Sequence, residues 1–128
     1  MAVRVVRLGA PREKNEGLRI GTVRRPPRGV KKSDYARLDY YDTWLPELAP
    51  SQDLVTRALS AESDAEWAAF VRAYRKEMSQ PGPRHLLDLL ANLSHSSALA
   101  VGCYCRDEAR CHRSVLRELL ADRGADLA

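Results

Sequence analysis

The sequence lacks any long apolar run, and its longest apolar stretches fall far short of the ~20 residues that a membrane span requires. The N-terminal residues 1–8 alternate apolar with basic side chains and lack the unbroken apolar region of a signal peptide. Internal repeats and low-complexity segments are absent as well. We therefore expect a cytoplasmic protein with no membrane partner.

Cysteine is scarce, and its placement excludes a disulfide-stabilised fold. The chain has three cysteines, an odd number, and all of them lie within residues 103–111. Small disulfide-rich domains instead spread an even number of cysteines along the chain. Any role of these thiols is therefore local to one site.

The length and composition indicate one folded domain. A chain of 128 residues has the size of an ordinary domain, and its 45% apolar residues suffice for a hydrophobic core. We therefore expect a single domain over residues 1–128.

The net charge of +4 is unevenly distributed. Residues 1–41 hold eleven Lys and Arg against four Asp and Glu, whereas residues 42–128 carry a net −3. Seventeen of the 21 basic residues are Arg, whose guanidinium group suits bidentate contact with phosphate or carboxylate. The basic third suggests an anionic partner, although such charge is often only a solvated face.

Apolar patterning predicts a small α/β fold. Strands are expected at 3–8, 18–24 and 98–104, and helices at about 51–59, 63–78, 84–93 and from 107–111 to 123. A strand that follows a helical crossover usually lies parallel to its predecessor. We expect a single layered domain with a short, mostly parallel sheet and packed helices. Ligands of such sheets bind at the carboxyl ends of the strands, where segments 24–29 and 103–113 are expected to be adjacent.

The segment 103–113 concentrates reactive side chains. It contains Cys103, Cys105, Cys111 and His112, together with three arginines. Because the segment enters a helix N-terminus and carries guanidinium groups, a thiol there should have a lowered pKa. His112 is a candidate acid, base or ligand.

Three interpretations of this segment remain open. It is an anion-binding catalytic loop, a Cys₃His zinc site, or a set of small thiols packed at a strand end. The spacing differs from that of common zinc motifs, and neighbouring side chains such as Cys111 and His112 diverge by ~100° on a helix. We therefore expect no bound metal, no cofactor and free thiols, with His112 directed toward an arginine-lined edge rather than toward Cys103.

Arginines also follow the second strand. Arg24, Arg25 and Arg28 are expected either to form a phosphate clamp or to pair with downstream carboxylates. The carboxylates in question are Asp34, Asp39 and Asp42. The nearby aromatic residues Tyr35, Tyr40, Tyr41 and Trp44 could stack on a base or could close a loop over the core. For Trp44 we expect loop closure.

Four separated motifs resemble the YeaO-like branch of the domain-of-unknown-function 488 (DUF488) family. They are Arg24-x-x-Pro27-Arg28-Gly29, Trp44-Leu45-Pro46-Glu47-Leu48-Ala49-Pro50-Ser51, Trp67-x-x-Phe70-x-x-x-Tyr74, and Arg106-Asp107-Glu108 leading to His112. The resemblance implies a small prokaryotic α/β protein of the cytoplasm and does not imply a reaction. The triplet at 111–113 resembles the Cys-His-Arg signature of the other branch, so His112 is the position that both branches share.

These observations lead to one functional hypothesis and its alternatives. We expect a small cytoplasmic enzyme or binding protein that acts on a phosphorylated or nucleotide-like anion. The alternatives are a nucleic-acid-binding module that uses the basic N-terminal third, and a cysteine-based redox or zinc site. The catalytic candidates are His112, Cys105 and Cys111, and the anion-binding candidates are Arg24, Arg28, Arg110 and Arg113.

Overall fold

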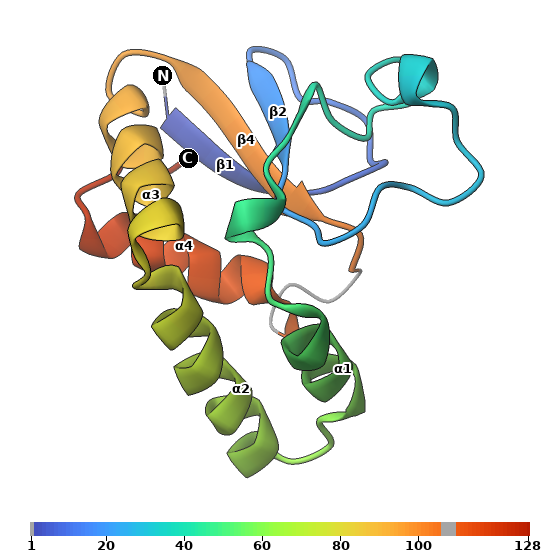
Figure 1. Cartoon of the computed structure of the whole chain (residues 1–128). Coiled ribbons are helices and arrows are strands. Elements are labelled where there is room, and N and C mark those ends of the chain that lie inside the picture. The colour runs from blue at the N-terminus through green and yellow to red at the C-terminus, as the bar shows by residue number, and fades with distance from the viewer. Residues whose placement is uncertain (1, 106–109) are drawn as a thin grey trace.

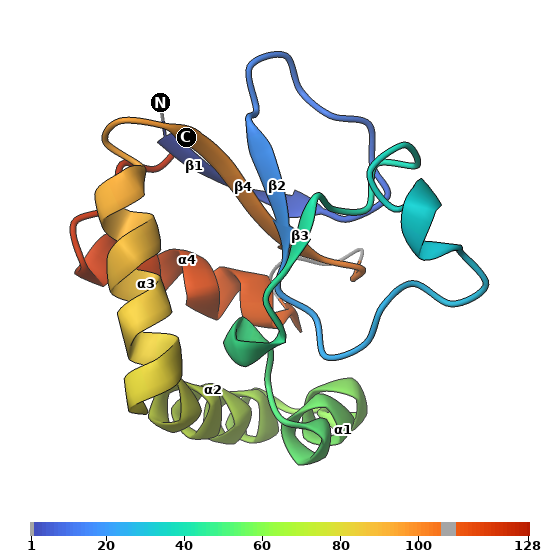
Figure 2. The ribbon, with the colours of Figure 1, turned by 45° about the horizontal axis from the view of Figure 1, so that its top comes forward.

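The computed structural model describes residues 2–105 and 110–128. Its centre is a four-stranded sheet in the order β1-β4-β2-β3, in which every described pair of neighbours is parallel (Figure 1 and Figure 2). The strands are β1 (Ala2–Arg7), β2 (Leu18–Gly21), β3 (Thr43–Trp44) and β4 (Ala98–Cys103). The predicted α/β class with a short parallel sheet is confirmed.

The helices are α1 (Gln52–Ser60), α2 (Asp64–Met78), α3 (Pro81–Leu93) and α4 (His112–Asp122), with 3₁₀ turns η1 (Lys32–Asp34) and η2 (Pro46–Leu48). Helix α3 begins three residues before the predicted position 84. Pro81 occupies its first turn, where the missing backbone N–H costs no hydrogen bond. None of the helices in the described part of the chain is long and apolar enough to cross a membrane.

The helices gather on one side of the sheet, whereas the segment 22–42 extends beyond its β2–β3 edge (Figure 2). The main core lies between the sheet and these helices. Val3, Leu99 and Val101 of the sheet contribute to it, together with Phe70 and Tyr74 of α2. This packing fixes α2 and α4 relative to the carboxyl ends of β2 and β4, where the candidate site lies.

The sequence did not predict strand β3, which has only two residues. Of two aromatic residues near it, Tyr41 is buried, as the loop-closure alternative predicts. Trp44 instead is 40% exposed and donates its indole N–H to the carbonyl of Val23 at 2.7 Å. Tyr41 packs directly over Gly21, where a β-carbon would collide with the ring. Closure of the loop over the core is therefore achieved by Tyr41, and the expectation for Trp44 is wrong.

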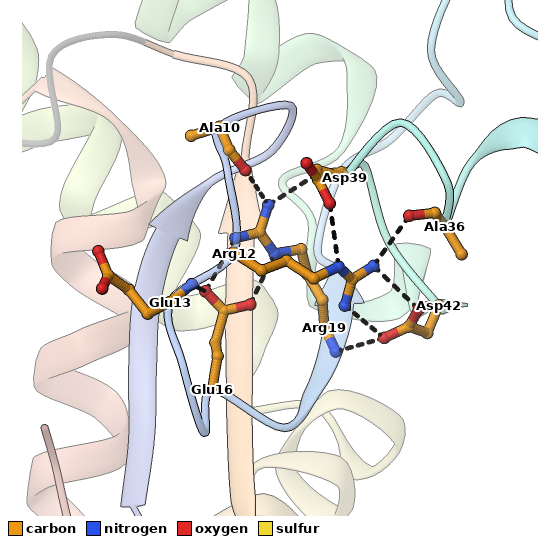
Figure 3. A network of polar contacts seen from close by, with 8 residues as sticks. All are labelled: Ala10, Arg12, Glu13, Glu16, Arg19, Ala36, Asp39 and Asp42. Atoms are coloured by element: carbon orange, nitrogen blue, oxygen red, sulfur yellow. Dashed lines mark hydrogen bonds and ion pairs between the residues drawn. The ribbon is translucent and has the colours of Figure 1, made fainter.

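A buried ion pair holds the connections around β2 in place (Figure 3). Arg19 is 1% exposed and contacts the Glu16 carboxylate through Nε at 2.9 Å and Nη2 at 2.8 Å. Its Nη1 atom donates to the carbonyls of Ala10 and Asp39, each at 2.7 Å. One guanidinium group thus joins the β1–β2 connection to the loop that precedes β3.

Candidate functional site

A pocket of about 510 Å³ lies at the carboxyl ends of β2 and β4. Residues 24–28 line one part of it, and Cys103, Cys105, Cys111 and His112 line another. The predicted adjacency of segments 24–29 and 103–113 is confirmed for the described residues. Further wall comes from α1 and α2, through Val55, Ala58, Leu59 and Phe70.

The end of β4 and the start of α4 bring two thiols and an imidazole together. Cys103 is the last residue of β4, and Cys111 has an extended backbone (φ −128°, ψ 150°) immediately before α4 begins at His112. The ligand atoms of Cys103, Cys111 and His112 all lie within 4.8 Å of one another. Both of these thiols are 2% exposed.

His112 is oriented by the backbone of the segment after β2. Its Nε2 atom lies 2.7 Å from the carbonyl oxygen of Thr22, which can only accept, so Nε2 carries the hydrogen. The other ring nitrogen, Nδ1, lies 3.8 Å from Sγ of Cys111. The edge of the ring meets Tyr74 with centroids 5.6 Å apart.

The expectation that His112 points away from Cys103 is therefore wrong. It assumed that Cys111 and His112 occupy successive positions of one helix and diverge. Among the described residues α4 begins at His112, and the extended conformation of Cys111 turns its side chain to the same place. The earlier part of the predicted range for this helix start falls in 106–109, outside the described residues.

The three thiols share protons unequally. The pKa of Cys105 is lowered because the Cys103 and Cys111 thiols donate hydrogen bonds to its anion, and the charge of Arg113 adds to the effect. The pKa of Cys103 is raised, because its proton is held in those contacts and the site is buried. The pKa of Cys111 is raised to about 11. The pKa is therefore lowered at the exposed thiol, Cys105, and raised at the two buried thiols.

Burial has the opposite consequence for the imidazole. It lowers the pKa of His112 to about 4, although the hydrogen bond to Thr22 and the Cys105 anion favour the charged form. At neutral pH the ring is neutral, with its hydrogen on Nε2 and its lone pair on Nδ1 facing the thiols.

Three of the four predicted anion-binding arginines line the pocket. Arg24 is fixed by donating from Nε and Nη2 to the carbonyls of Pro50 and Ala49 at 3.0 and 3.1 Å. Arg110 contacts Asp64 at 2.7 Å and lies 5.7 Å above the centre of the Trp67 ring. Arg28 is exposed at the pocket rim.

Arg113, the fourth, is placed differently. It is 4% exposed and donates from Nη2 to the carbonyl of Cys105 at 2.6 Å. Within the described part of the chain, its buried Nε atom has no hydrogen-bond partner. Arg113 therefore contributes a buried positive charge beside the thiols.

The sequence also allowed Arg24, Arg25 and Arg28 to pair with downstream carboxylates. In the described part of the chain, these carboxylates pair with other arginines. Arg12 contacts both Asp39 and Asp42, and Arg37 contacts Asp34. Sequence reasoning did not single out Arg12 or Arg37.

Sequence reasoning also missed two contributors to the site. Thr22 acts through its backbone carbonyl, which leaves no trace in the choice of side chain. Tyr104 donates its hydroxyl to the carbonyl of Arg25 at 3.0 Å and so joins the two pocket-lining segments. Its position between Cys103 and Cys105 was the available signal.

Comparison with known protein families gives one result. The family described as the active DUF488-N3 subclade (DUF488-N3a) matches residues 3–124. Comparisons with curated proteins and with solved structures found no match. Assignment to the YeaO-like branch stays a prediction, whereas the match over nearly the whole chain establishes that the protein belongs to the DUF488 family.

Proposed function

We propose that the pocket binds a small phosphorylated or nucleotide-like anion and that the protein is an enzyme acting on it. The observation that supports this proposal is that Arg24, Arg28 and Arg110 line one pocket together with three thiols and an imidazole. The volume of about 510 Å³ falls within the range of ~300–1,000 Å³ found for small-ligand sites.

The two halves of such a ligand would meet different surfaces. The guanidinium of Arg24 is held by two carbonyls, so its charge is already positioned and little conformational entropy is lost on binding. Val55, Ala58 and Leu59 offer an apolar surface for a sugar or base ring. A ligand with one anionic end and one flat body matches this division.

The reactive end of the pocket is provided by Cys105, Cys111 and His112. The group places a thiol of lowered pKa and an imidazole of lowered pKa beside the bound molecule. An apolar wall with arginines alone would serve for binding, and the added thiols favour an enzyme over a passive binding protein.

A ligand screen by thermal unfolding tests the proposal. Inorganic phosphate, glucose 6-phosphate and adenosine monophosphate are added to the reduced protein, since a ligand of the native state at 100 times its Kd stabilises by ~2.7 kcal/mol. We expect at least one phosphorylated probe to raise Tm, and Arg28→Ala to reduce that shift. The matched control is Arg37→Ala, an arginine paired with Asp34 away from the pocket.

Two results would contradict the proposal. One is the absence of a Tm shift with every probe, and the other is equal loss of the shift in Arg28→Ala and Arg37→Ala. A larger shift with an oligonucleotide than with the mononucleotide, falling steeply with salt, would favour the nucleic-acid alternative.

A further inference from the structure

The cluster formed by Cys103, Cys111 and His112 has the spacing of a partly assembled metal site. Tetrahedral zinc bonds to sulfur at ~2.3 Å and to histidine nitrogen at ~2.1 Å, which places its ligand atoms ~3.5–3.8 Å apart. Sγ of Cys111 and Nδ1 of His112 are already 3.8 Å apart, and the three ligand atoms lie within 4.8 Å.

The hydrogen bond of His112 prepares it as a ligand. Histidines that bind metals generally donate their second ring N–H to a carbonyl or carboxylate, which fixes the tautomer and the ring orientation. Nε2 of His112 donates to the Thr22 carbonyl at 2.7 Å, leaving the lone pair of Nδ1 directed at the thiols.

Cys105 and Arg113 complete the chemical environment. Cys105 lines the same pocket as Cys103, Cys111 and His112, and unlike the other two thiols it is exposed. Three thiolates and one neutral imidazole around a divalent zinc ion carry a net charge of −1. The buried guanidinium of Arg113, bonded to the Cys105 carbonyl, supplies the compensating +1.

The sequence-based expectation of no metal had two grounds, the unusual spacing of the candidate ligands and the divergence of Cys111 from His112. The second ground fails, because the extended backbone of Cys111 precedes the first residue of α4. The sequence spacing of the candidate ligands is a weaker argument against zinc, because the fold brings the end of β4 and the start of α4 together.

We propose that Cys103, Cys105, Cys111 and His112 bind one zinc ion at the end of the pocket. The ion joins the last residue of β4 to the first residue of α4 and gives this end of the pocket a fixed shape. The inference does not depend on the proposed anion binding, because zinc content is measured without any anion. With zinc bound, Cys105, Cys111 and His112 serve as its ligands in place of the reactive roles proposed above, so a zinc-loaded site leaves the anion-binding arginines and replaces the thiol chemistry.

Zinc content and cobalt substitution test the site directly. The protein is purified in reducing buffer without chelators, and its metal content is measured by mass spectrometry before and after incubation with Zn²⁺. We expect one zinc per chain. Replacement by Co²⁺ should give the visible bands of tetrahedral cobalt together with sulfur-to-cobalt charge-transfer absorption in the near ultraviolet.

Matched variants separate ligation from folding. His112→Gln should weaken zinc binding by at least ~100-fold, since loss of a partner that only orients a ligand already costs 10–100-fold. His85→Gln, an exposed histidine on α3, is the control and should bind as tightly as the unaltered protein. Circular dichroism of each variant verifies that the fold is retained. Cys105→Ser, at the exposed ligand, should retain the fold and lose the charge-transfer intensity of one thiolate.

Several outcomes would overturn the proposal. Zinc well below one per chain after incubation, in reduced and folded protein, would show that there is no site. Equal affinities of His112→Gln and His85→Gln would remove the histidine from it. Unchanged affinity and cobalt spectrum in Cys105→Ser would overturn the four-ligand set, and recovery of a Cys105–Cys111 disulfide in place of metal would favour the redox alternative.

Discussion

The imidazole of His112 donates to the backbone carbonyl of Thr22 at 2.7 Å, and this bond joins the start of α4 to the segment that follows β2. The two residues are 90 positions apart in the sequence. His112 also lines the pocket, so the shape of that pocket wall and the packing of α4 depend on the same side chain.

We predict that His112→Ala destabilises the metal-free protein by ~2–4 kcal/mol. The change removes a hydrogen bond, leaves the Thr22 carbonyl without its imidazole donor and deletes the ring that packs against Tyr74. Urea unfolding in the presence of EDTA and reductant measures it. His85→Ala, on the exposed face of α3, should stay within ~0.5 kcal/mol of the parent. Equal stability of the two variants would show that His112 does not hold the segment after β2.

Tyr74 provides a second stability prediction. Its side chain is fully buried, and its hydroxyl donates to the carbonyl of Leu48 at 2.6 Å. Tyr74→Phe keeps the ring and leaves that carbonyl without this donor, so we expect a loss of ~1–3 kcal/mol in urea unfolding. Tyr40→Phe, at a partly exposed ring, is the control and should change stability by less than ~0.5 kcal/mol.

The fold was predictable where local signals agreed with tertiary packing. Helix α2 is the clearest case: Ser63 accepts from the backbone N–H of Glu66 at 3.1 Å, as the capping sequence predicts, and Phe70 and Tyr74 face the core. The start of α4 had no such signal. Its N-cap residue is Cys111, which makes no side-chain capping bond, so the sequence allowed a start anywhere from 107 to 111.

The candidate site was predictable in its location and not in its geometry. The carboxyl ends of parallel strands meet at one edge, which is why segments 24–29 and 103–113 were expected together. The direction of His112 was not predictable, because it depends on the Thr22 carbonyl and on the backbone angles of Cys111. Backbone acceptors and cap conformations leave little pattern in a single sequence.

The buried Glu16–Arg19 pair predicts a large and specific cost of mutation. Both side chains are at most 2% exposed, so Glu16→Gln leaves the Arg19 charge buried without its counter-charge. Removing one partner of a buried pair costs ~3–5 kcal/mol. Asp34→Asn, in the exposed pair with Arg37, should cost no more than ~1 kcal/mol. Comparable losses in the two variants, measured by urea unfolding at pH 7, would contradict this account.

The same pair gives a pH dependence of defined sign. Burial alone would raise the pKa of Glu16, but the hydrogen bonds and charge of Arg19 lower it below its ordinary value of 4.5. A group whose pKa is lower in the folded state than in the unfolded state contributes stability. This contribution is fully present above the unfolded-state pKa and is lost as the pH falls through the folded-state pKa. The free energy of unfolding should therefore decrease as the pH is lowered beneath 4.5, and this decrease should be less steep in Glu16→Gln. Parallel pH profiles for the two proteins would exclude Glu16 as a source of the effect.

A variant of Tyr104 tests whether residues 24–28 must be held in a fixed position for the ligand to bind. Its hydroxyl donates to the Arg25 carbonyl at 3.0 Å, between Arg24 and the rim of the pocket, and the contact is exposed. Removing it in Tyr104→Phe should cost less than ~1 kcal/mol of stability, because an exposed donor and acceptor both regain water. The 24–28 segment then loses a fixed position, so a phosphorylated probe that raises Tm should bind ~3–10-fold more weakly by calorimetry, a loss of ~0.7–1.4 kcal/mol. Tyr35→Phe alters a tyrosine that is not among the residues lining this pocket and should leave the affinity unchanged. An affinity retained in Tyr104→Phe would show that Arg24 and Arg28 are positioned without this bond, by the contacts of Arg24 with Ala49 and Pro50 alone.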